Sequence, residues 1–320
     1  MSSFQGLAEE REECEVKLSF ELWPNNPYGE LGVTGVPINS WGNKPIEWQV
    51  DRVAEYGYAG VDFFYDMFLE YSDKEYDRMK NELGGYVASK GLEIASVGAH
   101  HLTLTNRKWA RKGQMENIKR AIDFSASINA RTLVAYIAGY YWPQTYLLMS
   151  RKEARQIMID TVREAAEYAG ERGLTFSIEP HQETYINLPE PTIDVIEAVG
   201  LDNVRVTIDF GGMELGIKPH MSIEEGFKAF APYLDHIHAK DITGVIGNWN
   251  MVWFGGGMVN FRRYADALRA IGYDGYVAVE WEGWFKGGPG GVGDMDSAGL
   301  GDMDRAAVEI RDFLAPIFED

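Results

Sequence analysis

Four apolar segments of the chain each end in one side chain that could bind a metal. In chain order they are LTFSIEPH with Glu179, NVRVTIDF with Asp209, LDHIHAKD with His238 and YVAVEWEGW with Glu280. Apolar residues predominate up to each of these side chains, as in strands buried in a sheet. Two glutamates, one aspartate and one histidine suit Mn²⁺, Mg²⁺ or Co²⁺ better than a thiophilic metal, and Zn²⁺ stays open.

The spacing of these four residues indicates a repeated structural unit. The intervals between them are 30, 29 and 42 residues, which is the length of a strand, a helix and two loops. If consecutive parallel strands close into a barrel, the carboxyl ends of strands five to eight lie at one rim, where such barrels place their sites. We therefore expect the four side chains to converge.

The same unit of amphipathic helix, glycine or asparagine stop and apolar strand recurs along the chain. With residues 16–23 as the first strand, eight strand candidates alternate with helices. This pattern predicts an α/β fold, a single (β/α)8 TIM barrel spanning residues 16–320, after an N-terminal tail at 1–15. The helix predicted at 151–172 has one apolar face, with Ser150 as its N-cap and Glu153 three residues later.

Three connections are long for a barrel of this kind. They follow strands 1, 7 and 8, at residues 24–45, 243–259 and 283–304. Such loops are usually functional or disordered, and for those after strands 7 and 8 we favour covers of the site over mobile surface. The first loop, which carries Trp41, could also cover the site.

Composition limits the classes of function. The net charge of −19 disfavours nucleic acid as a partner. Cys14 is the only cysteine, so neither an intrachain disulfide nor a thiolate metal site can form. No apolar run approaches the length of a membrane span, and the first residues lack the pattern of a signal peptide, so we expect no membrane partner and a cytoplasmic location.

Five motifs, taken together and in order, carry a resemblance. They are IEPH at Glu179, IDFGG at Asp209, HIHAKD at His238, VEWEGW at Glu280 and GGGMVNF at 255–261. The chain resembles the xylose isomerase-like TIM barrel superfamily over residues 45–315, in particular its sugar (phosphate) isomerase/epimerase branch of ketose 3-epimerases and inosose dehydratases. The resemblance implies one divalent metal ion held by Glu179, Asp209, His238 and Glu280, with the two glutamates flanking the bound sugar.

This set of residues suits removal of a proton next to a sugar carbonyl. A divalent cation can stabilise the enolate oxygen as charge develops. Glu179 and Glu280 could then remove and return the proton. We expect a metal-dependent sugar isomerase or epimerase, with Mn²⁺ as the first choice of metal. His181 could act as a further acid or base, or could have a structural hydrogen-bonding role.

Other side chains at the predicted strand ends are candidates for binding substrate. They are Lys240, His101, Trp142 and Trp281. Lys240 shares a strand face with His238 and could hold a substrate oxygen or form an ion pair with a carboxylate. His101 could instead cap a loop, and the tryptophans could pack between elements or against a sugar face. His236 lies deeper on the same face and is favoured as a core residue.

Two departures from the resemblance keep an alternative open. Epimerising members often carry a histidine at the position of Gly212 and an arginine at that of Gly244. The alternative is a lyase or dehydratase acting on a keto-sugar, an inosose or a 3-keto-glycoside, including C-glycoside cleavage. No phosphate cradle is present in the sequence.

Other functions and partners also stay open from the sequence. The chain could also be a sugar-binding barrel without catalytic activity. A DNA-repair nuclease is disfavoured, because its several metals would need many histidines and the chain has only six. Beyond a sugar or glycoside substrate, a second copy of the chain or an accessory subunit could be a partner.

Overall fold

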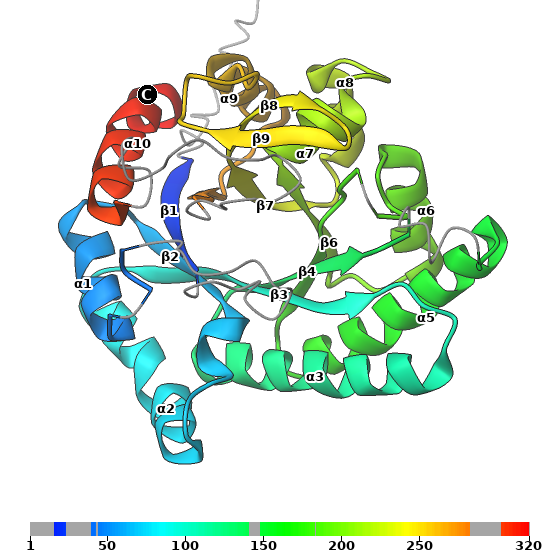
Figure 1. Ribbon diagram of the computed structural model, residues 1–320, viewed down its shortest axis with the longest axis horizontal. Coiled ribbons are helices and arrows are strands. Elements are labelled where there is room, and N and C mark those ends of the chain that lie inside the picture. Colours follow the sequence, from blue (N-terminus) through cyan, green and yellow to red (C-terminus); the bar gives the residue numbers. More distant parts are fainter. Residues whose placement is uncertain are drawn as a thin grey trace, which may run out of the picture.

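The computed structural model describes residues 16–23, 40–42, 44–140, 148–182, 184–281 and 302–319. Within these ranges, eight parallel strands close into a barrel in the order β1, β10, β7, β6, β5, β4, β3 and β2 (Figure 1). The barrel strands are β1 (Lys17–Leu22), β2 (Gly60–Phe64), β3 (Glu93–Thr103), β4 (Thr132–Ala138), β5 (Thr175–Ile178), β6 (Val204–Asp209), β7 (Leu234–Ala239) and β10 (Tyr276–Val279). The predicted (β/α)8 TIM barrel is confirmed.

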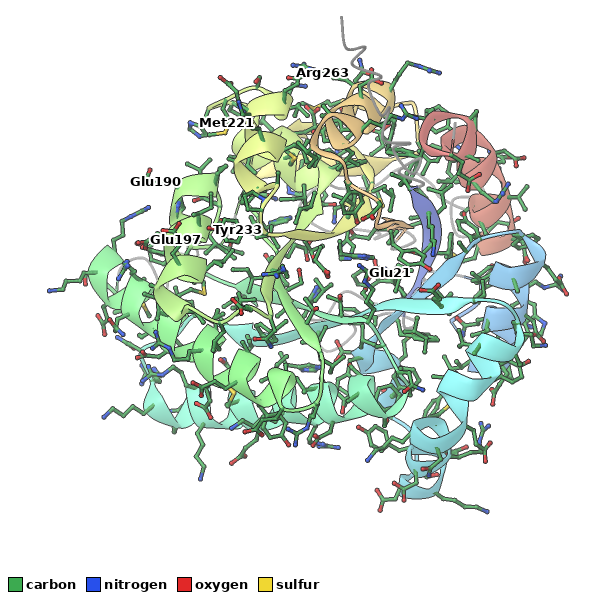
Figure 2. All side chains as sticks on the ribbon, turned by 180° about the vertical axis from the view of Figure 1, so that it is seen from behind. Glu21, Glu190, Glu197, Met221, Tyr233 and Arg263 are labelled. Atoms are coloured by element: carbon green, nitrogen blue, oxygen red, sulfur yellow. The ribbon has the colours of Figure 1, made fainter. Side chains whose placement is uncertain are left out.

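The barrel strands are buried on both faces. Every residue of β2 and β10 is buried, as expected for parallel strands with helices outside and packed side chains inside. In β1, Leu18 and Phe20 alternate with Ser19 and Glu21, and successive side chains of a strand point to opposite faces. Figure 2 shows Glu21 inside the ring of strands, where it is buried. The polar positions of β1 therefore face the barrel interior.

Helices surround the strands in Figure 1. They are α1 (Ile46–Glu55), α2 (Asp73–Ser89), α3 (Lys108–Ser127), α5 (Arg151–Gly170), α6 (Pro189–Val199), α8 (Ile223–Phe230), α9 (Phe261–Ile271) and α10 (Met303–Phe318). Shorter helical turns are η2 (Tyr65–Phe68), α7 (Phe210–Gly212) and η3 (Met213–Ile217). The predicted cap of α5 is confirmed, because the Ser150 side chain accepts a hydrogen bond from the backbone N–H of Glu153.

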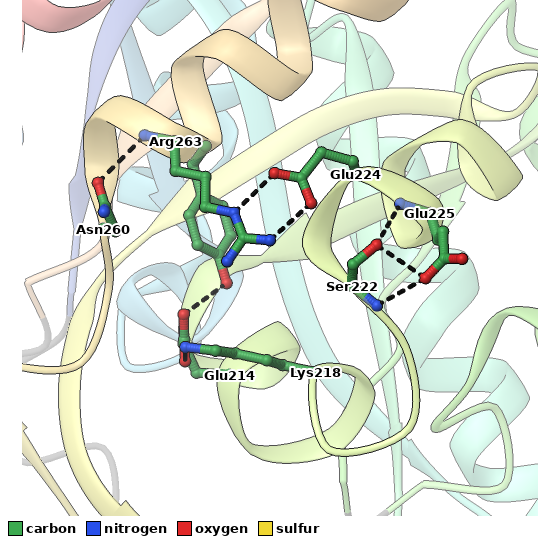
Figure 3. Close-up of polar contacts among 8 residues, drawn as sticks. Glu214, Lys218, Ser222, Glu224, Glu225, Asn260 and Arg263 are labelled. Carbon is green, nitrogen blue, oxygen red and sulfur yellow. Dashed lines mark hydrogen bonds and ion pairs between the residues drawn. The ribbon is translucent and has the colours of Figure 1, made fainter.

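Polar contacts join α8 and α9 beside the barrel, as Figure 3 shows. Arg263 on α9 donates two hydrogen bonds to Glu224 on α8, at 2.6 and 2.7 Å. The Asn260 side chain caps α9 by accepting from the N–H of Arg263. The start of α9 is thus fixed where the chain returns from the barrel mouth.

The connection after β7 differs from the predicted loop. It contains an antiparallel hairpin of β8 (Asp241–Val245) and β9 (Asn248–Val252) outside the barrel. The prediction of a loop was wrong here because the segment lacks the apolar alternation of a half-buried strand. The hairpin lies at the upper edge of the ring in Figure 1.

Most of the other two long connections lies outside the described residues, and so does the predicted tail at 1–15. Trp41, from the first of these connections, is 1% exposed and contacts the rings of Phe20, Trp48 and Tyr56. Because Phe20 points outward from β1, Trp41 packs between β1 and α1 and does not cover the barrel mouth as predicted. Among the described residues, no helix combines the length and apolar character needed to cross a membrane.

Candidate metal centre

A cavity of about 150 Å³ lies at the carboxyl ends of the barrel strands. The residues that line it are Glu21, Trp23, Gly98, His100, Val134, Tyr136, Glu179, His181, His238, Lys240, Trp249 and Glu280. They come from β1, β3, β4, β5, β7 and β10 or directly follow them, and Trp249 comes from the hairpin. This is the rim where barrels of this kind carry their sites.

A larger cavity of about 390 Å³ lies between α3 and α5. Charged side chains that line it form ion pairs with one another, including Lys119 with Glu164 at 2.7 Å and Lys112 with Glu116 at 3.8 Å. None of the candidate residues lines it, so the chemistry is centred on the barrel mouth.

Three of the four predicted metal ligands form one buried group. Oxygen or nitrogen atoms of Glu179, His238 and Glu280 all lie within 4.8 Å of one another. His238 Nδ1 lies 3.4 Å from Glu179 Oε1 and 3.5 Å from Glu280 Oε2. The convergence follows from the topology, because β5, β7 and β10 end at the same rim.

The fourth predicted ligand, Asp209, ends β6 beside this group. One of its oxygens, Oδ1, accepts the backbone N–H of Gly212 at the start of α7. The other, Oδ2, lies 3.7 Å from Lys240 Nζ, and Lys240 Nζ lies 2.7 Å from Glu280 Oε1. Lys240 therefore forms the ion pair with a carboxylate that was one of its two predicted roles. Metal binding by Asp209 stays a prediction.

The side chains of this group fit a divalent cation. Among the described residues, four buried atoms of Asp209, His238 and Glu280 have no hydrogen-bond partner: His238 Nδ1, His238 Nε2, Asp209 Oδ2 and Glu280 Oε2. Buried polar atoms without partners are costly and need an explanation. Carboxylate oxygens with one imidazole are ligands that hard or borderline divalent metals accept.

Opposite charges inside the group shift its pKa values. Burial raises the pKa of Glu179, but the nearby His238 and Lys240 outweigh it and lower the pKa to about 2. Burial lowers the pKa of His238, yet Glu179, Glu21 and Glu280 raise it well above its usual value. Burial raises the pKa values of Asp209 and Glu280 in spite of Lys240. Glu179 is thus ionised, whereas burial disfavours the charged forms of Asp209 and Glu280, a cost that a cation bound beside them would offset.

His181 lines the same cavity, two residues after Glu179. Burial, helped by the charge of Lys240, lowers its pKa to about 3. Its ring meets that of Tyr136 edge to face at 5.4 Å. His181 is therefore a neutral imidazole at neutral pH, and it can accept a proton.

The predicted substrate-binding residues lie in different places. His101 Nε2 lies 3.0 Å from Asp66 Oδ1, and among the described residues His100, not His101, lines the cavity. Trp281 is fully buried against the rings of Trp253 and Phe254. Trp142 lies outside the described residues. Of the four, the structure brings only Lys240 into the described lining of the cavity.

Sequence reasoning missed several residues that line the cavity, among them Glu21, Trp23, Tyr136 and Trp249. Trp23 Nε1 donates a hydrogen bond to Glu21 Oε2 at 2.9 Å. Burial raises the pKa of Glu21 well above its usual value. Glu21 is a charged residue inside the apolar first strand, and it lies on the same strand face as Trp23. This pattern was the signal that could have identified Glu21 and Trp23.

Gly212 and Gly244, the two positions at which the chain departs from the resemblance, both act through their backbone. Gly244 has a φ of +116°, and a Cβ there would lie 2.3 Å from the carbonyl oxygen of Asn248, so the hairpin requires glycine. Gly212 donates its N–H to Asp209. An arginine at position 244 is thus excluded by the hairpin itself.

A second histidine lies beneath the site, inside the barrel. His236 Nε2 lies 3.0 Å from Asp62 Oδ1 across the ring, and both side chains are buried. Burial raises the pKa of Asp62, but the neighbouring His236, Ser19 and Ser96 lower it overall, so Asp62 is ionised. The core position favoured for His236 is confirmed.

This buried pair should stabilise the fold strongly. We expect Asp62→Ala to reduce the free energy of unfolding by about 3 to 5 kcal/mol, because it leaves the buried imidazole without its partner. Asp66→Ala, which removes the 3.0 Å partner of His101, is the matched control. Since the Asp66 side chain is 29% exposed, its loss should cost less than about 1 kcal/mol. Urea denaturation measures both, and equal losses would contradict this assignment.

Known proteins share this architecture. An inosose isomerase of Bacillus velezensis is 27% identical over 135 residues, 41% of this chain, and the match spans about half (48%) of that protein. An inosose dehydratase of Geobacillus thermodenitrificans is 22% identical over 81% of this chain and 87% of its own length. The structure of D-psicose 3-epimerase from Clostridium cellulolyticum H10 with D-tagatose superimposes with a TM-score of 0.73 at 20% identity, covering 95% of this chain and 100% of that one. The D-psicose 3-epimerase structure therefore has the same fold as this chain.

The family assignment rests on a longer match. The pattern that defines the family described as "Xylose isomerase-like TIM barrel" matches residues 50–292, more than half of the chain and including all four predicted metal ligands. The relatives named above are enzymes. The chain belongs to the xylose isomerase-like TIM barrel family.

Proposed function

We propose that this protein is a divalent-metal-dependent sugar isomerase or epimerase that removes a proton from the carbon next to a carbonyl group. One observation carries the proposal: two buried carboxylates, Glu179 and Glu280, lie on either side of His238 at the floor of a cavity. The names of the relatives, an inosose isomerase among them, support the same class of reaction.

The proposed ligands are Glu179, Asp209, His238 and Glu280, and the proposed metal is Mn²⁺. When bound, the cation supplies Lewis-acid stabilisation of the negative charge that develops on the substrate carbonyl oxygen. Glu179, Asp209, His238 and Glu280 are all buried, so water is largely excluded from the site. Electrostatic interactions in the site are therefore stronger than they would be in water.

The protein's own residues move the proton. Glu179, whose pKa is about 2, is a carboxylate and acts as the base. Glu280, whose pKa is raised by burial, is the partner that returns a proton. Each carboxyl group has two oxygens, so one can hold the cation while the other exchanges a proton. Lys240, 2.7 Å from Glu280, is within reach of a substrate oxygen in the same cavity.

A second candidate function is elimination by a lyase or dehydratase. His181 favours it, because a neutral imidazole in the cavity is an acid or base additional to the two glutamates. The proton that Glu179 removes from the substrate could pass to His181 and from there to the leaving group as its bond to the sugar breaks. The substrates would be a keto-sugar, an inosose or a 3-keto-glycoside, including a C-glycoside. The named inosose dehydratase relative supports this reading.

Proton NMR in D₂O distinguishes these functions. The Mn²⁺-loaded protein is incubated with ketoses, inososes and 3-keto-glycosides, and products are recorded after the metal is removed. We expect deuterium next to the carbonyl together with an isomeric product. Deuterium with a released group would move the assignment to a lyase. Absence of exchange across the panel would contradict both proposals and favour a sugar-binding barrel.

A further inference from the structure

One buried side chain, Asp241, closes the base of the β8–β9 hairpin where the chain leaves the barrel. Its Oδ1 accepts the backbone N–H groups of Ile242 and Val259 at 2.9 and 3.1 Å. Its Oδ2 accepts those of Gly255 and Gly257, both at 2.9 Å. We call Asp241 with these four N–H groups the Asp241 clasp. It joins the strand that leaves the barrel to the loop that returns toward α9.

The backbone around the clasp leaves no room for other side chains. A Cβ at Gly257 would lie 2.1 Å from Asp241 Oδ1 and 2.5 Å from the carbonyl oxygen of Ile242. The N–H of Met258 also donates to that carbonyl, at 2.7 Å. The glycines of this turn therefore allow the backbone to reach a fully buried carboxylate.

The hairpin brings Trp249 to the cavity. Trp249 pairs with Gly244 across the hairpin, and its side chain is part of the cavity lining. The hairpin follows β7, which is four strands away from β3 in the closed ring, so β3 lies across the mouth (Figure 1). Trp249 and His100 on β3 therefore approach the cavity from opposite sides.

Aromatic rings form a continuous wall on the β3 side. Trp23 stacks on Phe64 at 4.5 Å, and Phe64 meets His100 edge to face at 4.7 Å. His100 meets Tyr136 at 5.1 Å. We call Trp23, His100 and Tyr136, which line the cavity, the aromatic wall. Flat apolar surfaces on two sides suit a ring bound between them.

We propose that Asp241 is a positioning residue that holds Trp249 over the cavity, and that Trp249 with the aromatic wall selects glycosides with an aromatic aglycone over free sugars. The inference rests on the proposed function, because it places the sugar at the group of Glu179, His238 and Glu280. Asp241 itself does not line the cavity. It acts through the backbone of the hairpin.

Binding without turnover tests the selectivity. Titration calorimetry of the Mn²⁺-loaded protein compares phenyl glucoside with glucose, neither of which has a keto group. We expect the phenyl glucoside to bind about tenfold more tightly, the scale of an aromatic contact. Trp249→Ala should remove this preference, and Trp249→Phe should restore most of it. Equal affinities in the wild-type protein would overturn the proposal, whether or not any keto-sugar is converted.

Asp241→Asn tests the clasp. The amide group keeps one acceptor oxygen but turns an NH₂ toward two backbone donors, so two of the four hydrogen bonds are lost. We expect hydrogen exchange of residues 242–259 to accelerate at least tenfold and the phenyl preference to disappear. Asp266→Asn, an exposed change on α9, is the control. Unchanged exchange in the hairpin would overturn the positioning role.

A second variant keeps this test decisive if Asp241→Asn folds poorly. Gly257→Ala retains the carboxylate of Asp241 but adds a methyl group, whose carbon would lie 2.1 Å from Asp241 Oδ1. It should open the clasp and remove the phenyl preference. Gly256→Ala is the matched control, since its Cβ would come no closer than 3.1 Å to a neighbour. Equal behaviour of the two glycine variants would contradict the proposal.

Discussion

Glu179→Gln and Glu280→Gln are each expected to slow deuterium incorporation into the substrate by about 10³-fold or more. Each change keeps the size of the side chain and removes the group that takes or gives the proton, and acid–base catalysis alone contributes about 10² to 10⁴-fold. Loss of a charged ligand from the cation site adds to this effect. Exchange rates from NMR in D₂O, at saturating metal, measure it.

Glu214→Gln is the matched control for these two variants. Glu214 is as deeply buried as Glu179 and Glu280, but it lies on η3 outside the cavity. It pairs with Lys218 and accepts a hydrogen bond from Tyr264 at 3.2 Å (Figure 3). Glu214→Gln should lower the stability of the fold but keep the rate of deuterium incorporation within about threefold of the wild-type rate, because Glu214 takes no part in proton transfer. Wild-type exchange rates in Glu179→Gln and Glu280→Gln would contradict the proposed chemistry.

Mn²⁺ is expected to raise the melting temperature of the wild-type protein, and Lys240→Met is expected to enlarge that rise. Lys240 Nζ lies 2.7 Å from Glu280 Oε1 and 3.7 Å from Asp209 Oδ2. Its ammonium group thus competes with a metal for the same carboxylates. At a metal concentration of 100 Kd the rise should be about 5 °C. The variant should melt lower without metal, because buried carboxylates lose their partner.

Lys218→Met separates this competition from a general loss of stability. Lys218 pairs with the buried Glu214 (Figure 3), and neither residue is part of the cavity lining. Its replacement should lower the melting temperature and leave the metal-induced rise unchanged. Scanning calorimetry with EDTA and with Mn²⁺ gives both quantities. An identical metal-induced rise in Lys240→Met and the wild-type protein would show that Lys240 does not share the ligands.

The barrel could be predicted from the sequence because its signals are local. Apolar strands, glycine stops and amphipathic helices follow one another at a regular spacing, and the Ser150 cap was identified from two residues. Parallel strands with helical connections end at one rim, so Glu179, His238 and Glu280 had to lie close together. The hairpin could not be predicted, because four hydrogen bonds from residues up to 18 positions away hold it to Asp241.

The choice between neighbouring side chains also required the structure. His100 lines the cavity and His101 contacts Asp66. The register of β3 against β4 shifts between Ala99 and Leu102, which spans both histidines. A shift of this kind changes which side chain faces inward, and alternation alone cannot reveal it.

The sequence by itself determined the barrel and the rim at which four metal-capable side chains meet, because both follow from local pattern and from the geometry of parallel strands. Only the tertiary structure decided the contents of the cavity. Glu21 enters it from the first strand, Trp249 from the hairpin, and Lys240 pairs with Glu280. These contacts join residues far apart in the chain, so they depend on register, backbone hydrogen bonds and charge across space, which no segment of the sequence contains alone.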